Sequence, residues 1–445
     1  MQDEQGAYLL LENPSSEYPV IKHGNGVYVY DENGKKYLDG IGGIHVVSIG
    51  HGVNEIAEAV AKQMKSIAFV NRRLFLNEPA LKLASFVVNM ATSNMSNVYF
   101  VSGGSESNEM AYQIMYQYHR KKGNNGKRRV VGRWHSYHGF TIATESMGGH
   151  LRHRRKLPYL LDFPHIQPPH CYRCPYNLKF PSCALKCATE LRTLIEQEGP
   201  DTIGAFIAEP IIGSTGGAIT PPTGYYQVIR EICDEYDILF IADEVITGFG
   251  RTGANFGINW WDTEPDIITS GKGLSSGYAP IGSVIVSEKV NQVLKQGDEK
   301  VALRLTYSSN PIACATALAV QKYIQQNNLL QNCVAMGAYL KNKLNLLAKK
   351  TSCIGDVRGE GLLLAIELVS EKETKLPFPR KLKIQERIVR EALNMGLVLV
   401  GGTGTGNSLE GDHLLITPPF TISETECDQL IEILGLAITR VLKTL

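Results

Sequence analysis

The chain has 445 residues and a mass of 49.0 kDa, which is enough for two or three structural units. Its 45 basic and 44 acidic residues leave a net charge of +1, which excludes the positive bias of a protein that binds nucleic acid or a membrane surface. No stretch has the roughly 18 apolar residues of a membrane helix, and the acidic N-terminus lacks the apolar core of a signal peptide. We therefore expect a cytoplasmic protein whose nine cysteines are reduced or bound to metal.

The first two thirds of the chain alternate between strand-like and helix-like segments. Residues 26–31 and 33–39 predict two short strands around an Asn-Gly turn. Helical spacing predicts helices over 54–66, 78–90, 107–121, 190–198 and 225–235. Strands are predicted over 97–101, 129–134, 203–209, 238–242, 267–269 and 283–287. This alternation indicates an α/β fold with a mostly parallel, doubly wound sheet from about residue 70 to 310.

The last third predicts a smaller α+β domain. Helices over 313–327, 333–349 and 382–394 flank a strand at 361–369, and a final helix covers 424–442. We expect an N-terminal segment, 1–66, that contributes to this small domain, a large domain over 67–312, and the small domain itself over 313–445. The Gly-rich segment 401–411 predicts a flexible loop. It lacks the Gly-Lys-Ser/Thr ending of a phosphate-binding P-loop, which argues against nucleotide binding.

Two of the predicted strands end at an ionisable residue. The strand 238–242 is followed by Asp243, and the strand 267–269 is followed by Ser270-Gly271-Lys272-Gly273. Open α/β sheets bind ligands at the carboxyl ends of their strands, and glycines let a carbonyl compound approach the lysine. Each residue alone is more often a surface lysine or a helix-capping acid. Together, an imine-forming lysine and an acid that keeps a ring nitrogen protonated favour pyridoxal phosphate chemistry.

This segment resembles the signature of class III pyridoxal-phosphate-dependent aminotransferases, which have the fold-type I architecture. The resemblance implies that Lys272 forms an imine with the cofactor, that Asp243 pairs with the pyridine nitrogen, and that Val245 packs on one face of the ring. Gly103-Gly104-Ser105-Glu106 opens a predicted helix, where free amides favour an anion. It is similar to the family's phosphate-binding run. Gly104 and Ser105 match that run, and Gly103 replaces a serine.

Three more positions match family motifs. Tyr137, in Tyr-His-Gly, is implied to stack on the cofactor ring, although core packing would be the usual explanation of that tripeptide alone. Glu209, in Ala-Glu-Pro, is implied to lie near the substrate amine. Thr306 is implied to reach the cofactor phosphate of a neighbouring subunit, so the resemblance predicts a homodimer or a higher assembly. Many members have Gln at the position of Ile246, and we expect one polar contact to the ring to be missing.

The resemblance covers nearly the whole chain and is strongest to omega-amino acid and amine transaminases. It implies transfer of an amino group from an omega-amino acid or amine to a keto acid, pyruvate or 2-oxoglutarate, in two half-reactions. Another pyridoxal phosphate enzyme on this scaffold (an aminomutase, racemase or decarboxylase) is one alternative. A non-catalytic, metal-binding regulatory protein on the same scaffold is another.

The residues that would select the substrate are less clearly marked. GABA aminotransferases tend to have Arg at the position of Phe140, and amine–pyruvate enzymes often have Trp at the position of His45. No Arg lies between Gly401 and Thr417, where those enzymes often have one. We therefore expect His45, Phe140 and the loop 401–411 to shape substrate choice. Arg72 or Arg73 is the expected carboxylate anchor.

Four cysteines lie within 17 residues in the pattern C-x2-C-x8-C-x3-C. Four thiolates at such spacing suit tetrahedral zinc or an iron–sulfur cluster, whereas a set of reduced, buried thiols is the alternative. We predict a structural metal site, an iron–sulfur cluster slightly ahead of zinc, that stiffens this Pro-rich segment. Its ligands would be Cys171, Cys174, Cys183 and Cys187.

Overall fold

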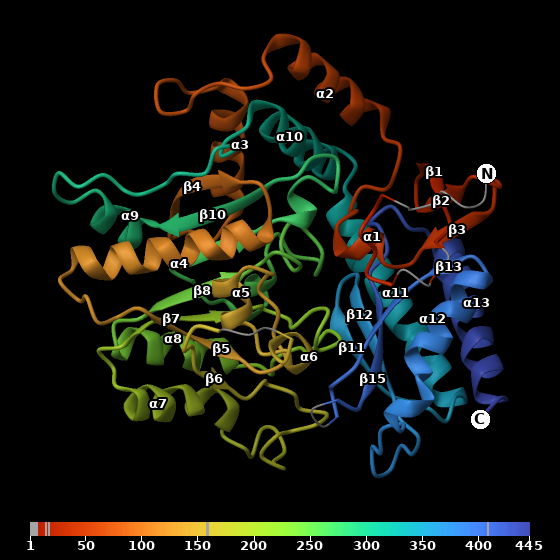
Figure 1. Cartoon of the computed structure of the whole chain (residues 1–445). Helices are drawn as coiled ribbons and strands as arrows, with labels where there is room; N and C mark the ends of the chain where they lie inside the picture. The colour runs from red at the N-terminus through yellow and green to blue at the C-terminus, as the bar shows by residue number, and fades with distance from the viewer. Residues whose placement is uncertain (1–7, 14–15, 17, 157–159, 407–408) are drawn as a thin grey trace.

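The computed structural model describes residues 8–13, 16, 18–156, 160–406 and 409–445, and its larger part is built on a seven-stranded sheet (Figure 1). The strands of this sheet are β4 (Met95–Val101), β5 (Arg129–Arg133), β6 (His165–Ile166), β7 (Ile203–Ala208), β8 (Leu239–Asp243), β9 (Ile267–Ser270) and β10 (Gly282–Ser287). Their order is β4-β10-β9-β8-β7-β5-β6. Strand β10 is antiparallel to both of its neighbours, and the other pairs are parallel. The predicted α/β fold with a mostly parallel sheet is confirmed.

Helices cover this sheet. They are α3 (Glu78–Met90), α4 (Gly104–Lys121), α5 (Ile142–Met147), α6 (Leu151–Arg154), α7 (Lys186–Glu198), α8 (Tyr225–Glu235) and α9 (Glu288–Leu294), with 3-10 turns η1 (Gly257–Trp261) and η2 (Lys272–Leu274). The sequence predicted α8 with its observed ends, and it predicted α7 to begin four residues later than it does. Capping sets some of these ends: the Asn77 side chain accepts a hydrogen bond from Ala80 N at 3.0 Å and so starts α3.

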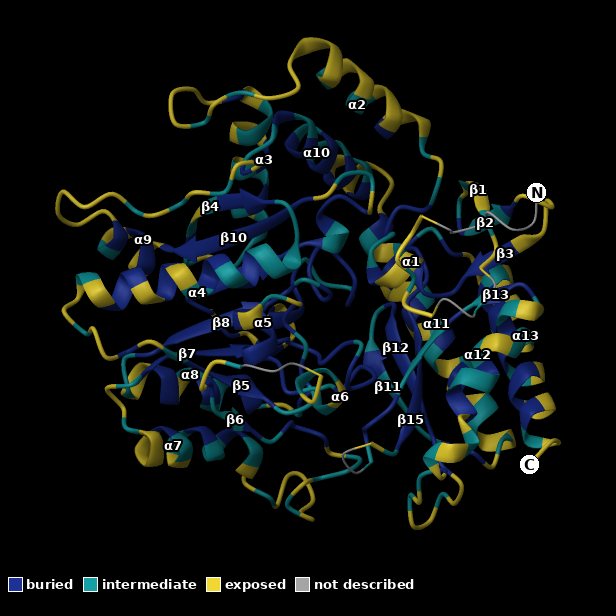
Figure 2. Cartoon of the chain, viewed as in Figure 1, coloured by how far each residue is buried: buried dark blue, intermediate teal, exposed yellow. Residues whose placement is uncertain are grey.

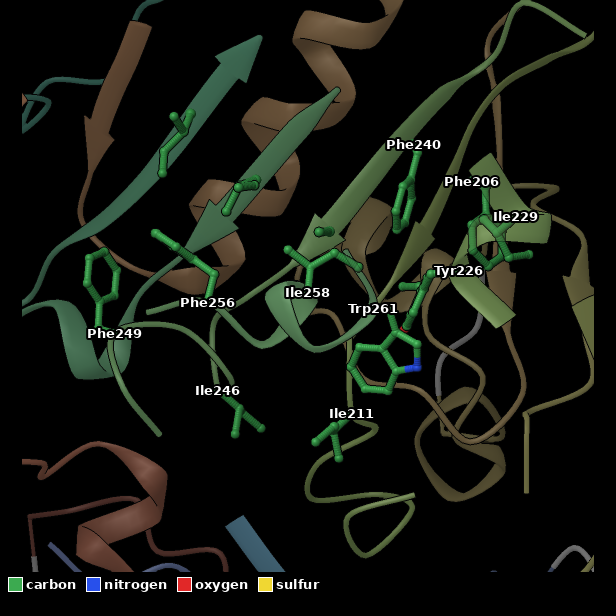
Figure 3. Close-up of a cluster of buried hydrophobic side chains, with 14 of the residues drawn as sticks. Phe206, Ile211, Tyr226, Ile229, Phe240, Ile246, Phe249, Phe256, Ile258 and Trp261 are labelled. Carbon is green, nitrogen blue, oxygen red and sulfur yellow. The ribbon is translucent and has the colours of Figure 1, made fainter. Parts of the chain in front are cut away.

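The central strands are buried on both faces (Figure 2). Strands β7 and β8 are continuous apolar runs because helices cover both sides of a parallel sheet. Figure 3 shows the aromatic packing behind them: the Tyr226 ring lies 5.6 Å from Phe240 and 5.1 Å from Trp261. This packing holds the carboxyl ends of the strands in fixed positions.

The smaller part contains two four-stranded sheets. Their strands are β1 (Ile21–Asn25), β2 (Tyr28–Asp31), β3 (Lys36–Asp39) and β13 (Leu397–Val398) in one sheet, and β11 (Ile354–Glu360), β12 (Leu363–Leu368), β14 (Val400–Gly402) and β15 (Asp412–Ile416) in the other. The remaining helices are α1 (Gly42–His45), α2 (Asn54–Ser66), α10 (Pro311–Gln326), α11 (Leu329–Lys350), η3 (Arg380–Leu382), α12 (Ile384–Asn394) and α13 (Glu424–Leu442). Strand β13 is parallel to β3, which ties the N-terminal strands to the C-terminal part. The division of the chain at residues 66 and 312 stays a prediction.

Segment 401–411 is not the open loop that its composition predicted. Strand β14 pairs with β15, and Thr403 and Thr405 are 1% and 4% exposed. A Cβ on Gly401 would overlap the Gln385 side chain. Its glycines therefore allow close packing, at least over the described residues 401–406 and 409–411.

Among the described residues, no helix is both long and apolar enough to cross a membrane.

Candidate active site

Asp243 and Lys272 lie at the carboxyl ends of two neighbouring strands. Asp243 is the last residue of β8, and it is in register with Thr269 of β9. Lys272 follows β9 by two residues and opens η2 with a φ of 35°, in the left-handed region that non-glycine residues rarely adopt. The sheet thus places an acid and a lysine side by side at the edge where such sheets bind ligands.

The Asp243 carboxylate accepts three hydrogen bonds. His138 Nδ1 and Asn108 Nδ2 each lie 2.7 Å from its Oδ2, and Val245 N donates to its Oδ1 at 3.1 Å. The Thr269 hydroxyl donates to Asn108 Oδ1 at 2.6 Å, and this contact fixes which end of the amide faces Asp243. Asp243 is therefore held rigidly, while Oδ1 can still accept from a further donor.

The Lys272 amine has no hydrogen bond or ion pair with any residue that the structure describes. Burial lowers the pKa of Lys272 to about 8, although Glu209 and Asp243 raise it; Arg251 lowers it further. Partial desolvation thus favours the neutral form of the lysine, which is the nucleophile.

The start of α4 packs directly against this edge. A Cβ on Gly104 would lie 2.8 Å from Val245 Cγ1, and a Cβ on Gly271 would lie 3.3 Å from Gly104 N. Gly139 has a φ of 134°, and a Cβ there would lie 2.6 Å from Ser105 Oγ. Glycine at these positions lets the free amides of the first turn of α4 meet the ends of β8 and β9. These amides can receive an anion such as a phosphate.

Glu209 and Tyr137 form the next side of the site. Glu209 directly follows β7; its Oε1 accepts from Tyr137 N at 3.1 Å and its Oε2 from Gly213 N at 2.9 Å. Burial raises the pKa of Glu209. Burial also raises the pKa of Tyr137, and the carboxylates of Glu145, Asp243 and Glu209 add to this in that order. Ile246 packs against Gly213, so an apolar side chain takes the place where many family members have Gln.

His45 is buried and links three segments of the chain. Its Nδ1 lies 2.8 Å from Thr417 Oγ1, and its Nε2 lies 2.9 Å from Ser214 Oγ. Because Thr417 gives its own proton to the Ile41 carbonyl, His45 Nδ1 donates to Thr417 and Nε2 accepts from Ser214. Burial, with the charges of Lys272 and Arg251, holds the pKa of His45 well below its usual value. His45 can shape the site near Lys272, but both ring nitrogens are already used.

The other residues predicted to contact substrate are more widely spread. Phe140 is 70% exposed, and its backbone N donates to Ser105 Oγ at 3.2 Å. Arg72 lies over the Tyr99 ring at 4.8 Å and donates to the Leu303 carbonyl. Arg73 and Thr306 are exposed. Within one chain, the structure therefore does not bring Arg72, Arg73 or Thr306 to Lys272.

The predicted metal site finds no support. Cys171, Cys174, Cys183 and Cys187 line one small cavity, but the described residues contain no group of three or more Cys, His, Asp or Glu side chains arranged to hold a metal ion. Burial raises the pKa of Cys171, and that of Cys187 to about 12, and the other thiols of the cluster add to both shifts. A buried ion pair between Arg173 and Glu367 of β12 fastens this segment instead.

Sequence reasoning missed three residues of the site. His138 stands beside Tyr137 in the Tyr-His-Gly motif, yet only its contact with Asp243 shows what it does. Asn108 lies one helical turn after Gly104, which places it on the same face of α4. Glu145 is buried near Tyr137, and no motif marked it.

The family model described as Aminotransferase class-III matches residues 12–438. The chain belongs to the class III aminotransferase family. It is 41% identical over 440 residues to YodT of Bacillus subtilis, an uncharacterized aminotransferase, with 99% of each chain covered. It is 36% identical to the putrescine–pyruvate aminotransferase of Pseudomonas aeruginosa, covering 93% of this chain and 88% of the relative.

Solved structures agree with this membership. A transaminase from the marine bacterium Virgibacillus superposes with a TM-score of 0.92 at 35% identity, and 99% of each chain is covered. An (S)-enantioselective omega-transaminase from Thermomicrobium roseum gives a TM-score of 0.90 at 36% identity, over 97% of this chain and 96% of the other. The enzyme is therefore an aminotransferase of the fold-type I class, as its sequence predicted.

Pyridoxal phosphate is the cofactor expected of this family, and the site fits it. The unpaired amine of Lys272 suits the aldehyde, and the free acceptor position on Asp243 suits the ring nitrogen. The glycine-lined start of α4 suits the phosphate. These three features lie at one edge of the sheet.

Proposed function

We propose that this aminotransferase moves an amino group from an amine or omega-amino acid to pyruvate or 2-oxoglutarate, with Lys272 and Asp243 as its catalytic residues. The observation that carries the proposal is the pairing at the sheet edge of a half-buried, unpaired lysine with a carboxylate that accepts three hydrogen bonds. The unpaired amine is free to react and to move a proton, whereas the hydrogen bonds keep the carboxylate in a fixed position.

Each residue would act on a stated atom. Bound pyridoxal phosphate supplies a carbonyl for the substrate amine and a ring that withdraws electrons. Lys272 Nζ takes the proton from the substrate carbon that bears the amine and returns a proton later in the cycle. Asp243 would accept a hydrogen bond from the ring nitrogen of the bound cofactor. Gly104 and Ser105 would hold its phosphate, and Tyr137 and Val245 would lie against its ring.

We also propose a homodimer in which Thr306 reaches the partner's site. Thr306 is exposed and is followed by Tyr307, on a face with several exposed apolar side chains. Phe69 and Tyr307 touch edge to face at 6.1 Å on this face. Its other exposed apolar residues are Met64, Ile67, Leu74, Phe75 and Leu76. An apolar patch of this kind marks an interaction surface. Arg72 and Arg73 belong to the same face. They would therefore bind a substrate carboxylate in the partner's site rather than in their own.

Names of relatives support an amine donor. Proteins that are 36% and 35% identical to this chain are called gamma aminobutyrate transaminase 2 in Solanum lycopersicum and vanillin aminotransferase in Capsicum annuum. A cytoplasmic location remains our proposal, and it is supported by nine cysteines that form no disulfide.

A panel of amines and keto acids tests the function. The enzyme loaded with pyridoxal phosphate should convert only when both an amine donor and a keto acid are present, and each half-reaction should change the absorbance of the bound cofactor. Repeated turnover without any amino acceptor, beyond one product molecule per active site, would contradict transamination and favour an aminomutase, racemase or decarboxylase.

A further inference from the structure

Gln321 is a buried amide on α10 that contacts the turn carrying Lys272. It is 1% exposed, and its Nε2 donates to the carbonyls of Gly273 and Leu274, at 3.0 and 2.9 Å. These are the two residues that follow Lys272 in η2. The amide therefore places both of its protons on the turn from which the lysine side chain extends, and the proposed mechanism gives it no role.

The orientation of this amide is set by its two acceptors. A backbone carbonyl can only accept a hydrogen bond, so the NH2 end of Gln321 must face Gly273 and Leu274. The other end is then left over, because Gln321 Oε1 is buried and accepts no hydrogen bond from any described residue. An unpaired buried oxygen is costly, and an apolar side chain at this position would avoid that cost. The two hydrogen bonds to the turn are therefore what the amide contributes here.

The turn needs this support because Lys272 has an uncommon backbone conformation. Its φ of 35° is left-handed, and a non-glycine residue keeps such a conformation only where its surroundings fix it. Before the lysine, the Ser270 carbonyl accepts from Ser107 Oγ at 2.7 Å. The Lys272 carbonyl itself accepts from Ser276 N at 3.1 Å. Gln321 fixes the residues that come after the lysine, so the turn is held on both sides.

Helix α10 gives Gln321 a firm base. Its N-terminus is capped by Asn310, whose Oδ1 accepts from Ala313 N at 3.0 Å. The helix packs on both α2 and α3, and Figure 1 shows the three helices side by side. Its buried residues reach two separate hydrophobic cores, Ala317 one and Val320 the other. A side chain on this helix can therefore keep the turn in one place.

We propose that Gln321 is a positioning residue for Lys272, because its two hydrogen bonds hold η2 and so keep the lysine amine in the place where it reacts. Gln321 touches neither substrate nor cofactor and acts only through the turn. A shift of about 1 Å at a reacting atom can lower a rate by about 10²-fold, so this support should appear in kcat rather than in KM. The inference rests on the proposed role of Lys272.

Gln321→Met tests the proposal with a side chain of similar length that cannot donate. In the holoenzyme, kcat should fall by about 10- to 100-fold while KM for the amine changes by less than about threefold. In the apoenzyme, backbone amides 274–276 donate to the carbonyls of Gly271 and Lys272. Their hydrogen exchange, followed by mass spectrometry, should become about tenfold faster or more. Gln325→Met makes the same change one helical turn later, at an exposed residue of the same cavity, and should match wild type in both measurements.

Gln321→Glu gives a readout that a loss of packing would not change. The introduced carboxyl has the shape of the amide and cannot donate when ionised, whereas its protonated form can donate to one of the two carbonyls. The described residues that line the cavity of about 240 Å³ beside Gln321 include no charged side chain, so burial should raise the pKa of this carboxyl. Relative to wild type at the same pH, kcat of Gln321→Glu should recover as the pH is lowered, and kcat of Gln321→Met should not.

The outcomes distinguish this inference from the proposed function. Wild-type enzyme that transfers no amino group from any donor would overturn the proposed function, and the inference with it. An active enzyme whose kcat and hydrogen exchange are unchanged in Gln321→Met would overturn the role of Gln321 alone. A loss that appears only in KM would also overturn that role. If Gln321→Met does not fold, the pH profile of Gln321→Glu decides, and a profile parallel to that of wild type would overturn the inference.

Discussion

Two buried carboxylates near Tyr137, Asp243 and Glu145, differ in how far the protein satisfies them. Asp243 accepts three hydrogen bonds from groups on three different segments, whereas Glu145 Oε1 faces only His153 Nδ1 of α6, at 3.3 Å. Both are 3% exposed, so burial does not explain the difference. A carboxylate that the protein fixes by its own hydrogen bonds suits a permanently bound partner such as a cofactor. Glu145 instead pairs with a histidine of the neighbouring helix and joins α5 to α6.

Of the substitutions considered, Asp243→Asn should have the largest effect on kcat. The amide cannot stabilise a protonated ring nitrogen as a carboxylate does, so kcat should fall by about 10³-fold with every donor. Steady-state kinetics with several amine donors measures this, and a loss confined to one donor would assign Asp243 to the substrate.

His138 should matter through Asp243. His138→Ala removes one of the two donors to Asp243 Oδ2, and kcat should fall by about 10- to 100-fold with all donors while KM changes little. His138→Asn should recover much of this activity, because its amide can donate from the position of Nδ1. The absorbance of the bound cofactor should shift with pH in the alanine variant and be restored in the asparagine variant. If the activity of His138→Asn is no higher than that of His138→Ala, His138 acts only by packing and not by its hydrogen bond.

A pH titration tests His150, whose ring meets the His153 ring edge to face at 4.6 Å. Burial lowers the pKa of His150 to about 4, below its ordinary value near 6.5. The unfolded chain therefore binds more protons between these two values, and His150 makes stability fall as pH is lowered through that window, by at most about 1.4 kcal/mol per pH unit. Tm should drop less between pH 6.5 and pH 4.5 in His150→Gln than in wild type. Equal drops would show that His150 is protonated in the folded enzyme.

The smallest effect is expected at the cysteine cluster. Cys174→Ser with Cys187→Ser should leave kcat unchanged and lower Tm only slightly, since the segment is fastened by Arg173 and Glu367. Metal analysis of protein purified without oxygen should find no stoichiometric zinc or iron in wild type. Bound metal that disappears in the double variant would restore the metal prediction.

The sequence predicted the parts of the fold and site that depend on local pattern. Asp243 and Lys272 follow apolar strands, so their meeting at one edge follows from a parallel sheet. The site's remaining contacts depend on distant segments: Asn108 reaches Asp243 only because α4 crosses the ends of β8 and β9. His45 is positioned by Ser214 and Thr417, which are far from it along the chain.

Composition misled the prediction in two places. Glycines at 401 and 402 predicted flexibility, whereas they permit close packing against Gln385 and His413. Four cysteines predicted a metal, whereas the described residues hold no group of three or more Cys, His, Asp or Glu side chains that could bind a metal ion. The packing around a segment cannot be read from a short stretch of sequence, because it depends on residues from distant parts of the chain.

The most direct test of the central claim is to find where the cofactor is attached. Holoenzyme would be reduced with borohydride, digested and analysed by mass spectrometry. A phosphopyridoxyl group should appear on the peptide that contains Lys272, and none should appear in Lys272→Ala. A label on another lysine, or an unlabelled enzyme that still transfers amino groups, would contradict it.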